Sequence, residues 1–347
     1  MRVRNAWVDY AKAIGIVLVV YGHVARGVFN AGLAMDGHWF TLVDSIIYSF
    51  HMPLFFFLSG LFFYDALIER GRLGLIVNKI DTIVYPFIVW SLLQGSCEVA
   101  LSNYTNGQVT LAEVLALAWQ PRAQFWFLHT LFLVFALCAC IYAKVARRYF
   151  LPVLLLFALL YVARQQLSLN SLVNLLLGNA VFFALGVWFN EVKAFFELWC
   201  RELMLLFGCL FLLGQYVFHI SLGLNYQHGG PGVLALATIA IVFICTLSMY
   251  LGRVRLNWLL VLGASSLSIY LMHILAGSGT RIILSTLLGV DSVAVHLLLG
   301  TLIGLTAPLL AQAMISRYRL NFLLSPPKSL SAALLAPRLA GRPKAPL

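Results

Sequence analysis

The sequence predicts an all-α membrane protein, a polytopic bundle of about ten transmembrane helices with both termini in the cytoplasm. The first reason is composition: 62% of the 347 residues are hydrophobic and 10% are charged, whereas soluble proteins average about 45–50% and about 25%. The second is that the apolar residues form continuous runs of about 20, enough to cross a bilayer as a helix, without the alternation of a β-barrel. The third is that basic residues gather at alternate breaks between the runs.

Ten apolar runs separated by polar breaks are the candidate helices. They cover about Val8–Phe29, Leu42–Tyr64, Ile80–Leu101, Phe125–Ala143, Leu151–Val162, Leu172–Phe189, Leu203–Leu222, Val233–Leu251, Trp258–Ala276 and Val293–Ile315. The fifth run is short for a full span, so a tilted or re-entrant element is the alternative. We expect a membrane domain over residues 1–324 and a basic, disordered cytoplasmic tail over residues 325–347, which is rich in Pro and Ala.

The basic residues set the expected orientation of the runs. Of the 23 lysines and arginines, 18 fall on the side of the N-terminus, four on the other side, and Lys12 lies inside the first run. The positive-inside rule therefore places both termini in the cytoplasm. The net charge of +11 is then an orientation signal that also attracts anionic lipid, so membrane lipids and not nucleic acid are the expected partners. The first run carries Lys12 and His23, which favours a retained span over a signal peptide.

Three ionisable residues share one face of the first run: Asp9, Lys12 and His23. On a helix, Lys12 and His23 lie about 20° apart around the axis and about 16 Å apart along it, while Asp9 is about 60° from Lys12. Ionisable groups inside spans are costly and usually functional, so these are the candidate catalytic residues. His23 suits a general base or covalent relay. Asp9, about 21 Å away along the helix, could orient it only through water or a bend. The alternative is that Lys12 reaches the headgroups and His23 bonds a neighbouring helix.

Further polar and aromatic residues in or beside the runs are candidates for substrate or donor binding. They are His51, Ser59, Tyr85, Trp126, His129, Ser266, Tyr270 and His273. Pro53 should kink the second run and open a cavity beside His51. Ser266, Tyr270 and His273 follow one helix face at i, i+4 and i+7. For Trp126, the alternative is an interfacial anchor. The sequence has no glycine-rich phosphate loop and no metal-ligand cluster, so neither a metal nor a permanently bound cofactor is expected.

Five segments in order resemble the acyltransferase-3 family of membrane acyltransferases. Lys12-x(10)-His23 is similar to the Arg/Lys-x(10)-His signature of the first helix. The others are FHMPLFFFLSG in the second helix, YPF at the start of the third, FWFL in the fourth and SLSIYLMH in a late helix. The second-helix segment most resembles the branch of fucose 4-O-acetylases and exopolysaccharide or nodulation-factor acetyltransferases.

The resemblance implies an O-acetyltransferase of the bacterial cytoplasmic (inner) membrane. It would transfer an acyl group, expected to be acetyl, from acyl-CoA to a sugar hydroxyl of a cell-surface or exopolysaccharide glycan or its lipid-linked precursor. His23 matches the essential histidine of the family, and Lys12 replaces the commoner arginine without its bidentate fork. The cations Arg70, Arg72 and Lys79, expected in a cytoplasmic loop, would bind the phosphates of the coenzyme. The alternative is that they serve orientation alone.

The donor is expected to enter through a polar cavity that is open to the cytoplasm and runs from this loop past Lys12 to His23. His51, Trp126, Ser266 and Tyr270 are its expected wall residues. The competing function is a transporter or flippase in which Lys12, His23 and His51 form a proton or substrate path. The ordered set of segments favours the enzyme. A purely structural scaffold would leave the ionisable face of the first run unexplained.

Overall fold

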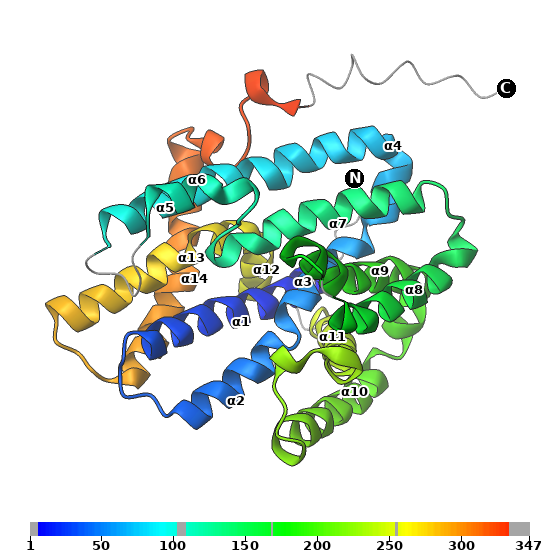
Figure 1. The fold of residues 1–347 in the computed structure, drawn as a ribbon, viewed down its shortest axis with the longest axis horizontal. Helices are drawn as coiled ribbons and strands as arrows, with labels where there is room; N and C mark the ends of the chain where they lie inside the picture. The colour runs from blue at the N-terminus through cyan, green and yellow to red at the C-terminus, as the bar shows by residue number, and fades with distance from the viewer. Residues whose placement is uncertain (1–5, 103–108, 168, 254–255, 333–347) are drawn as a thin grey trace.

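The structure is a computed structural model that describes residues 6–102, 109–167, 169–253 and 256–332. Within these ranges the chain forms helices and no strand (Figure 1). Ten helical stretches are long and apolar enough to cross a membrane, as predicted. The first seven helices are α1 (Ala6–Asn30), α2 (Gly37–Tyr48), α3 (His51–Leu61), α4 (Phe63–Lys79), α5 (Tyr85–Ala100), α6 (Leu111–Leu115) and α7 (Trp126–Tyr142). The remaining seven are α8 (Phe150–Ala163), α9 (Ser171–Leu198), α10 (Cys200–Gln215), α11 (Gly230–Leu251), α12 (Asn257–Ala264), α13 (Ser266–Ile282) and α14 (Val293–Arg317).

Helix α1 is the central element of the bundle. It packs against α3, α11, α12, α13 and α14 (Figure 1). Small residues on α1 and its neighbours permit close approach of the backbones, as is usual between membrane helices. At Gly263 of α12, for example, an added Cβ would collide with the backbone of Asp9. The residues that α1 carries are therefore held by contacts on several sides.

The second span is broken, as expected from Pro53. Helix α2 ends at Tyr48, Phe50 leaves the helical conformation with φ −140°, and α3 begins at His51. Proline lacks a backbone N–H and its ring clashes with the carbonyl four residues earlier, which here belongs to Ser49. The break lies at that point, and it gives α2 and α3 separate directions.

The third span differs from the expected loop and helix. Arg70 and Arg72 flank a break at Gly71, which has φ 69°. Lys79 is not in a loop, because the helix continues from it through a π-helical segment, Ile80–Val84, into α5. The apolar spacing around the buried Leu75 sustains this helix on the N-terminal side of Lys79. In the π-helical segment, the N–H of Tyr85 bonds the carbonyl of Ile80, ahead of Pro86, which has no N–H to offer.

The fifth and ninth expected spans have different ends in the structure. The fifth run forms α8, and 3₁₀ turns on both sides extend it to a stretch of 20 residues, Arg147–Gln166. The ninth run, expected over Trp258–Ala276, is divided. Its first half is the short α12, the chain turns at Ser265, and the candidate span is Ser266–Leu287. Serines compete with the helix by bonding nearby backbone, and three of them cluster at this turn.

The beginning of the expected disordered tail has contacts in the structure. The carboxylate of Asp81 accepts hydrogen bonds from Ser331 Oγ at 2.5 Å and from the N–H of Ala332 at 2.8 Å. Just before the tail, the carbonyl of Phe322 accepts from the Tyr85 hydroxyl at 2.7 Å. Ser331 and Ala332 thus lie against Asp81 of the π-helical segment. The rest of the tail lies outside the described residues.

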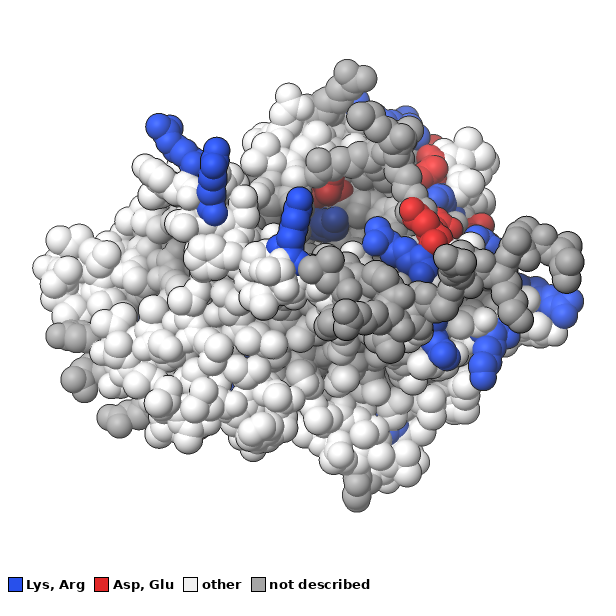
Figure 2. Space-filling view, turned by 90° about the horizontal axis from the view of Figure 1, so that it is seen from above, with Lys and Arg blue, Asp and Glu red and all other residues white. Residues whose placement is uncertain are grey.

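The outer surface separates charged from apolar regions. Figure 2 views the molecule from the top of Figure 1, and charged side chains gather over one part of that face, around a hollow in which both signs of charge are visible. Large apolar side chains elsewhere are highly exposed, including Leu212, Leu298 and Leu310 at 68–69%. A surface of this kind is stable against lipid tails and not against water.

Candidate active site

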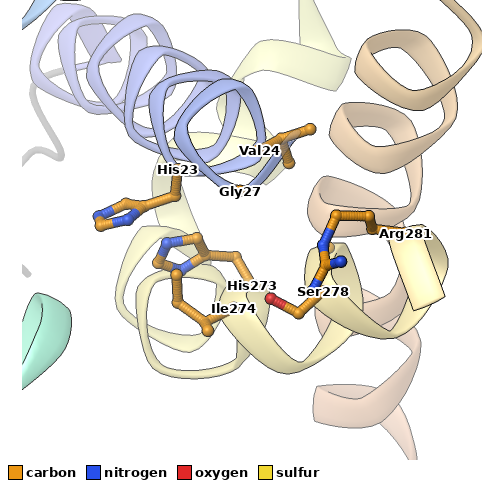
Figure 3. A pocket seen from close by; sticks show the side chains of 8 residues that line it. His23, Val24, Gly27, His273, Ile274, Ser278 and Arg281 are labelled. Carbon is orange, nitrogen blue, oxygen red and sulfur yellow. The ribbon is translucent and has the colours of Figure 1, made fainter. Parts of the chain in front are cut away.

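Three histidines from three helices meet near the middle of the bundle. The ring centroids of His23 on α1 and His273 on α13 are 5.1 Å apart, and Figure 3 shows the two rings next to one another. The Tyr48 ring joins them to His51 of α3, because its centroid lies 6.4 Å from that of His23 and 4.4 Å from that of His51. The first-helix histidine is thus not isolated, and we call this group the histidine cluster (His23, His51, His273 and Tyr48).

Hydrogen bonds to the backbone determine the tautomers of two of these histidines. His273 Nδ1 lies 2.8 Å from the carbonyl oxygen of Tyr270, and His51 Nδ1 lies 2.8 Å from that of Ile47. A carbonyl only accepts, so each Nδ1 carries the proton and each Nε2 keeps a lone pair. Both Nε2 atoms are buried and have no hydrogen-bond partner among the described residues. The cluster therefore contains two oriented proton acceptors beside His23.

A narrow space adjoins the histidines on the side of the C-terminal end of α1. We call it the His23 hollow; its lining residues are His23, Val24, Gly27, His273, Ile274, Gly277, Ser278 and Arg281 (Figure 3). Its volume of about 10 Å³ is room for one water molecule. A hydroxyl group is of similar size, so the hollow can admit a single small polar group to the histidines.

A much larger cavity lies toward the other end of α1. We call it the Lys12 cavity; its polar lining residues are Lys12, Ser59, Lys79, Thr82, Ser266 and Tyr270. Aromatic and aliphatic side chains, mostly of α3 and α7, form the remaining walls. Its volume of about 360 Å³ falls within the range of small-molecule sites, which combine apolar walls with a few polar groups.

Both cations of the Lys12 cavity are held by neighbours. Lys12 Nζ lies 3.7 Å from the carboxylate of Asp9, whose side chain is only 7% exposed. Lys79 Nζ lies 4.2 Å above the ring centroid of Phe135, a favourable cation–π distance. The cavity thus brings together two cations, Lys12 and Lys79, that are 67 residues apart in the sequence.

Helices α1 and α13 run parallel and connect the cavity to the histidines. Lys12 shares the cavity with Ser266 and Tyr270 at the start of α13, and His23 meets His273 further along both helices. The Tyr270 and His273 ring centroids are 6.1 Å apart. The cavity itself ends at Tyr270, whereas we expected it to continue to His23. Aromatic rings fill the gap, with Phe127 lying 5.4 Å from the Tyr270 ring.

Several candidate binding residues lie away from these spaces. Tyr85 bonds the segment after α14, and His129 Nε2 lies 3.1 Å from the carbonyl oxygen of Ala118. Trp126 contacts the Phe127 ring but lines neither the Lys12 cavity nor the His23 hollow. His51 belongs to the histidine cluster and not to the cavity wall. Its expected role as a wall residue, like that of Trp126, does not match the structure.

The remaining candidates divide between the cavity and the surface. Ser59 lines the Lys12 cavity while its hydroxyl donates to the carbonyl of Phe55 at 2.8 Å. Arg70 and Arg72 are exposed at the break in α4, and Arg70 lies within electrostatic range of Lys79. The surface arginines therefore approach the cavity through Lys79 and not as part of its lining.

A polar group that the sequence analysis did not single out borders the histidine cluster. Arg26 makes two hydrogen bonds to the carboxylate of Asp44, at 2.7 and 2.8 Å, and one to the Tyr226 hydroxyl at 3.0 Å. Its guanidinium carbon lies 3.3 Å above the Tyr48 ring centroid. The sequence spacing could have indicated this group. Arg26 follows His23 by three residues and Tyr48 follows Asp44 by four, so each pair lies on one helix face. These contacts fix the Tyr48 ring against the histidines.

The site therefore consists of a cationic cavity, a histidine cluster and a narrow hollow, set in a bundle of candidate transmembrane helices. The profile of the acyltransferase-3 family, described as an acyltransferase domain, matches residues 5–313. The chain belongs to this family and is a multi-pass integral membrane acyltransferase.

Two curated relatives are weakly similar to part of the chain. Nodulation protein NolL of Sinorhizobium fredii (strain NBRC 101917 / NGR234) is 26% identical over 125 residues, which is 36% of this chain and 33% of the relative. Nodulation protein NolL of Mesorhizobium japonicum (strain LMG 29417 / CECT 9101 / MAFF 303099) is 26% identical over 134 residues, 39% of this chain and 35% of the relative. The matches thus span about a third of the length of each relative. No solved structure matches the chain.

Proposed function

We propose that this acyltransferase is an O-acetyltransferase of the bacterial cytoplasmic membrane. It transfers an acetyl group from acetyl-CoA to a sugar hydroxyl of a cell-surface or exopolysaccharide glycan, or of its lipid-linked precursor. The observation that carries the proposal is the order of groups along the parallel helices α1 and α13. The cationic Lys12 cavity comes first, Tyr270 closes it, and the His23–His273 pair follows.

The Lys12 cavity suits an acyl-CoA donor. Its lining includes Lys79, with Arg70 in electrostatic range, and these cations can bind the phosphates of the coenzyme. The apolar walls suit the thin pantetheine arm, and Lys12 can neutralise a phosphate or polarise the thioester carbonyl as a point charge. With the N-terminus in the cytoplasm, this cavity faces the compartment in which acyl-CoA is made.

The chemistry requires a base for the acceptor hydroxyl and leaves the thiol protonated. The hydroxyl oxygen attacks the thioester carbonyl carbon while His23 takes the hydroxyl proton. The C–S bond then breaks, the ester is released, and the coenzyme thiolate receives the proton from His23. His273 lines the same hollow as His23, and its Nε2 has no hydrogen-bond partner among the described residues, so it can hold the proton between these steps. A covalent relay through His23 remains the alternative order of bond formation.

The test uses the full-length protein in lipid nanodiscs with acetyl-CoA and a saccharide acceptor. Release of the free thiol of coenzyme A and the mass increment of one acetyl group on the acceptor are measured together. His23→Ala should abolish both, and His38→Ala is the matched control because His38 is exposed at the start of α2. If the His23→Ala protein keeps the wild-type rate, the proposed chemistry is refuted. Proton or saccharide flux without thiol release would instead favour the transporter alternative.

A further inference from the structure

Arg281 lies at the end of α13 opposite the Lys12 cavity. It lines the His23 hollow together with His23 and His273, and Figure 3 shows its guanidinium beside Ser278. Its Nε atom is buried and has no hydrogen-bond partner among the described residues, and no carboxylate of these residues pairs with it. Arg281 is partly buried, and a buried donor such as its Nε–H is costly without an acceptor.

The other arginines on this side of the bundle are partnered. Arg26 pairs with Asp44 at 2.7 Å, and Arg122 pairs with Glu98 at 3.0 Å. Arg164 donates to the carbonyl of Asn174 at 3.0 Å. Of these four arginines, Arg281 is the one without a partner for its side chain among the described residues.

A second space opens from Arg281 between α5 and α13. We call it the Arg281 crevice; it has a volume of about 260 Å³ and is lined mainly by apolar groups. Leu101 closes it from the end of α5, and Leu275 and Ile282 line it from α13. The crevice shares Ile274, Ser278 and Arg281 with the His23 hollow, so the two spaces adjoin. Glu98 also lines it, but its carboxylate is engaged by Arg122 and Gln94.

The Arg281 crevice is complementary to a ligand that carries an anionic group on an apolar chain. The planar guanidinium favours phosphate, which it can bind through two hydrogen bonds. The leucine and isoleucine side chains suit a hydrocarbon. The adjoining hollow has room for one hydroxyl group, which would point at His23 and His273.

We propose that Arg281 and its crevice bind the acceptor as a saccharide linked through phosphate to a polyprenyl lipid. The phosphate lies on Arg281, the lipid chain enters sideways between α5 and α13, and a sugar hydroxyl reaches the histidines through the His23 hollow. This inference rests on the proposed function, because it names the acceptor class of the same site. The donor and acceptor then approach the histidine cluster from opposite ends of α13.

Binding of a polyprenyl phosphate tests the inference directly. The full-length protein is placed in phosphatidylcholine nanodiscs, and native mass spectrometry compares a polyprenyl phosphate with the corresponding polyprenol and with inorganic phosphate. The wild type should prefer the polyprenyl phosphate by about tenfold or more over the polyprenol, as expected for charge-assisted hydrogen bonds. Arg281→Gln should lose this preference and Arg281→Lys should keep part of it. Arg317→Gln, which removes an exposed arginine at the end of α14, should keep all of it.

A crevice variant tests the place of the lipid chain. Leu101 is 48% exposed, so Leu101→Trp can fill the crevice without entering the core, and it should weaken binding of the polyprenyl phosphate. Leu310→Trp, on the outer face of α14, is its control.

Four results would overturn the inference. Two are that the wild type binds polyprenol, or inorganic phosphate, as tightly as the polyprenyl phosphate. The others are that Arg281→Gln keeps the wild-type preference, or that phosphatidylglycerol displaces the polyprenyl phosphate as well as unlabelled polyprenyl phosphate does. The last result would assign Arg281 to bulk lipid headgroups. None of these measurements involves acetyl-CoA, so failure here is distinct from failure of the His23-dependent thiol release.

Discussion

Replacing Gly60 with alanine is expected to force α3 and α9 apart. The two helices cross with one glycine from each. An added Cβ on Gly60 would collide with the carbonyl oxygen of Phe183, and it would lie 3.0 Å from that carbonyl carbon and 3.2 Å from the nitrogen of Val187. These are backbone atoms, which cannot turn aside as a side chain can, so the helices themselves must move.

The geometry of this crossing predicts how much stability each variant loses and how the two losses combine. Overpacking of this kind costs about 1–3 kcal/mol, and backbone collisions favour the upper part of that range. Gly186 is the reciprocal contact, because its added Cβ would collide with the carbonyl of Phe57. One separation of the helices relieves both collisions, so the double variant should lose less stability than the sum of the two single losses. Because α3 carries His51 and Ser59, activity should fall together with stability.

Thermal unfolding of the purified protein at one fixed heating rate measures the effect. Gly60→Ala and Gly186→Ala should each lower the midpoint by several degrees, since about 1 kcal/mol shifts the midpoint of a large domain by about 2–4 °C. Gly279→Ala is the control, because its added Cβ meets open space within α13, and its midpoint should stay the same or rise. If Gly60→Ala unfolds at the same temperature as Gly279→Ala, the close crossing of α3 and α9 is wrong.

Four other outcomes are expected. His23→Ala should reduce acyl transfer by about 10²–10⁴-fold, the usual worth of a general base, as measured by thiol release; a fall within twofold would exclude His23 from the chemistry. Lys12→Ala should raise KM for acyl-CoA while Lys12→Arg retains most of the affinity, because a ground-state charge contact acts on binding; equal KM values in steady-state kinetics would reduce Lys12 to an anchor. Arg26→Gln should lower the free energy of unfolding by about 1–3 kcal/mol, because the Asp44 carboxylate, 13% exposed, loses its partner. Adding Asp44→Asn should recover part of the lost thermal midpoint. A further additive loss in the double variant would contradict the pairing. Asp81→Asn should release the segment at Ser331 and speed its cleavage in limited proteolysis without lowering the thermal midpoint; unchanged cleavage would mean that Asp81 does not hold the segment.

The sequence was sufficient for the number of spans but not for all of their ends. Apolar runs of about 20 residues indicate contact with lipid, and the described residues form ten helical stretches long and apolar enough to span a membrane. Hydropathy does not register the turn at Ser265 or the uninterrupted helix through Lys79, because both depend on backbone hydrogen bonds. The division of the ninth run and the continuation of the third span therefore needed the structure.

The site was predictable where its residues lie on one helix. The Lys12–His23 spacing placed both on one face of α1, and the i+7 spacing placed His273 in line with Ser266. Contacts between helices were not predictable in this way. The residue type of Trp126 suggests a role in the site, but tertiary packing decides which residues of this segment reach it. The Phe127 ring packs on the Tyr270 ring, and the Tyr270 hydroxyl donates a hydrogen bond to the carbonyl of Gln124.

The narrowness of the His23 hollow also bears on the electrical insulation of the membrane. A continuous file of water between the Lys12 cavity and the Arg281 crevice would conduct protons and discharge any gradient across the bilayer. The hollow holds about one water molecule, and Val24 closes it against the glycine face of α13, where an added Cβ on Gly277 would lie 3.1 Å from the valine side chain. A space of this size has no room for a continuous file of water. In the proposed mechanism, the constriction that admits one hydroxyl group to the histidines thus also limits the passage of ions between the two spaces.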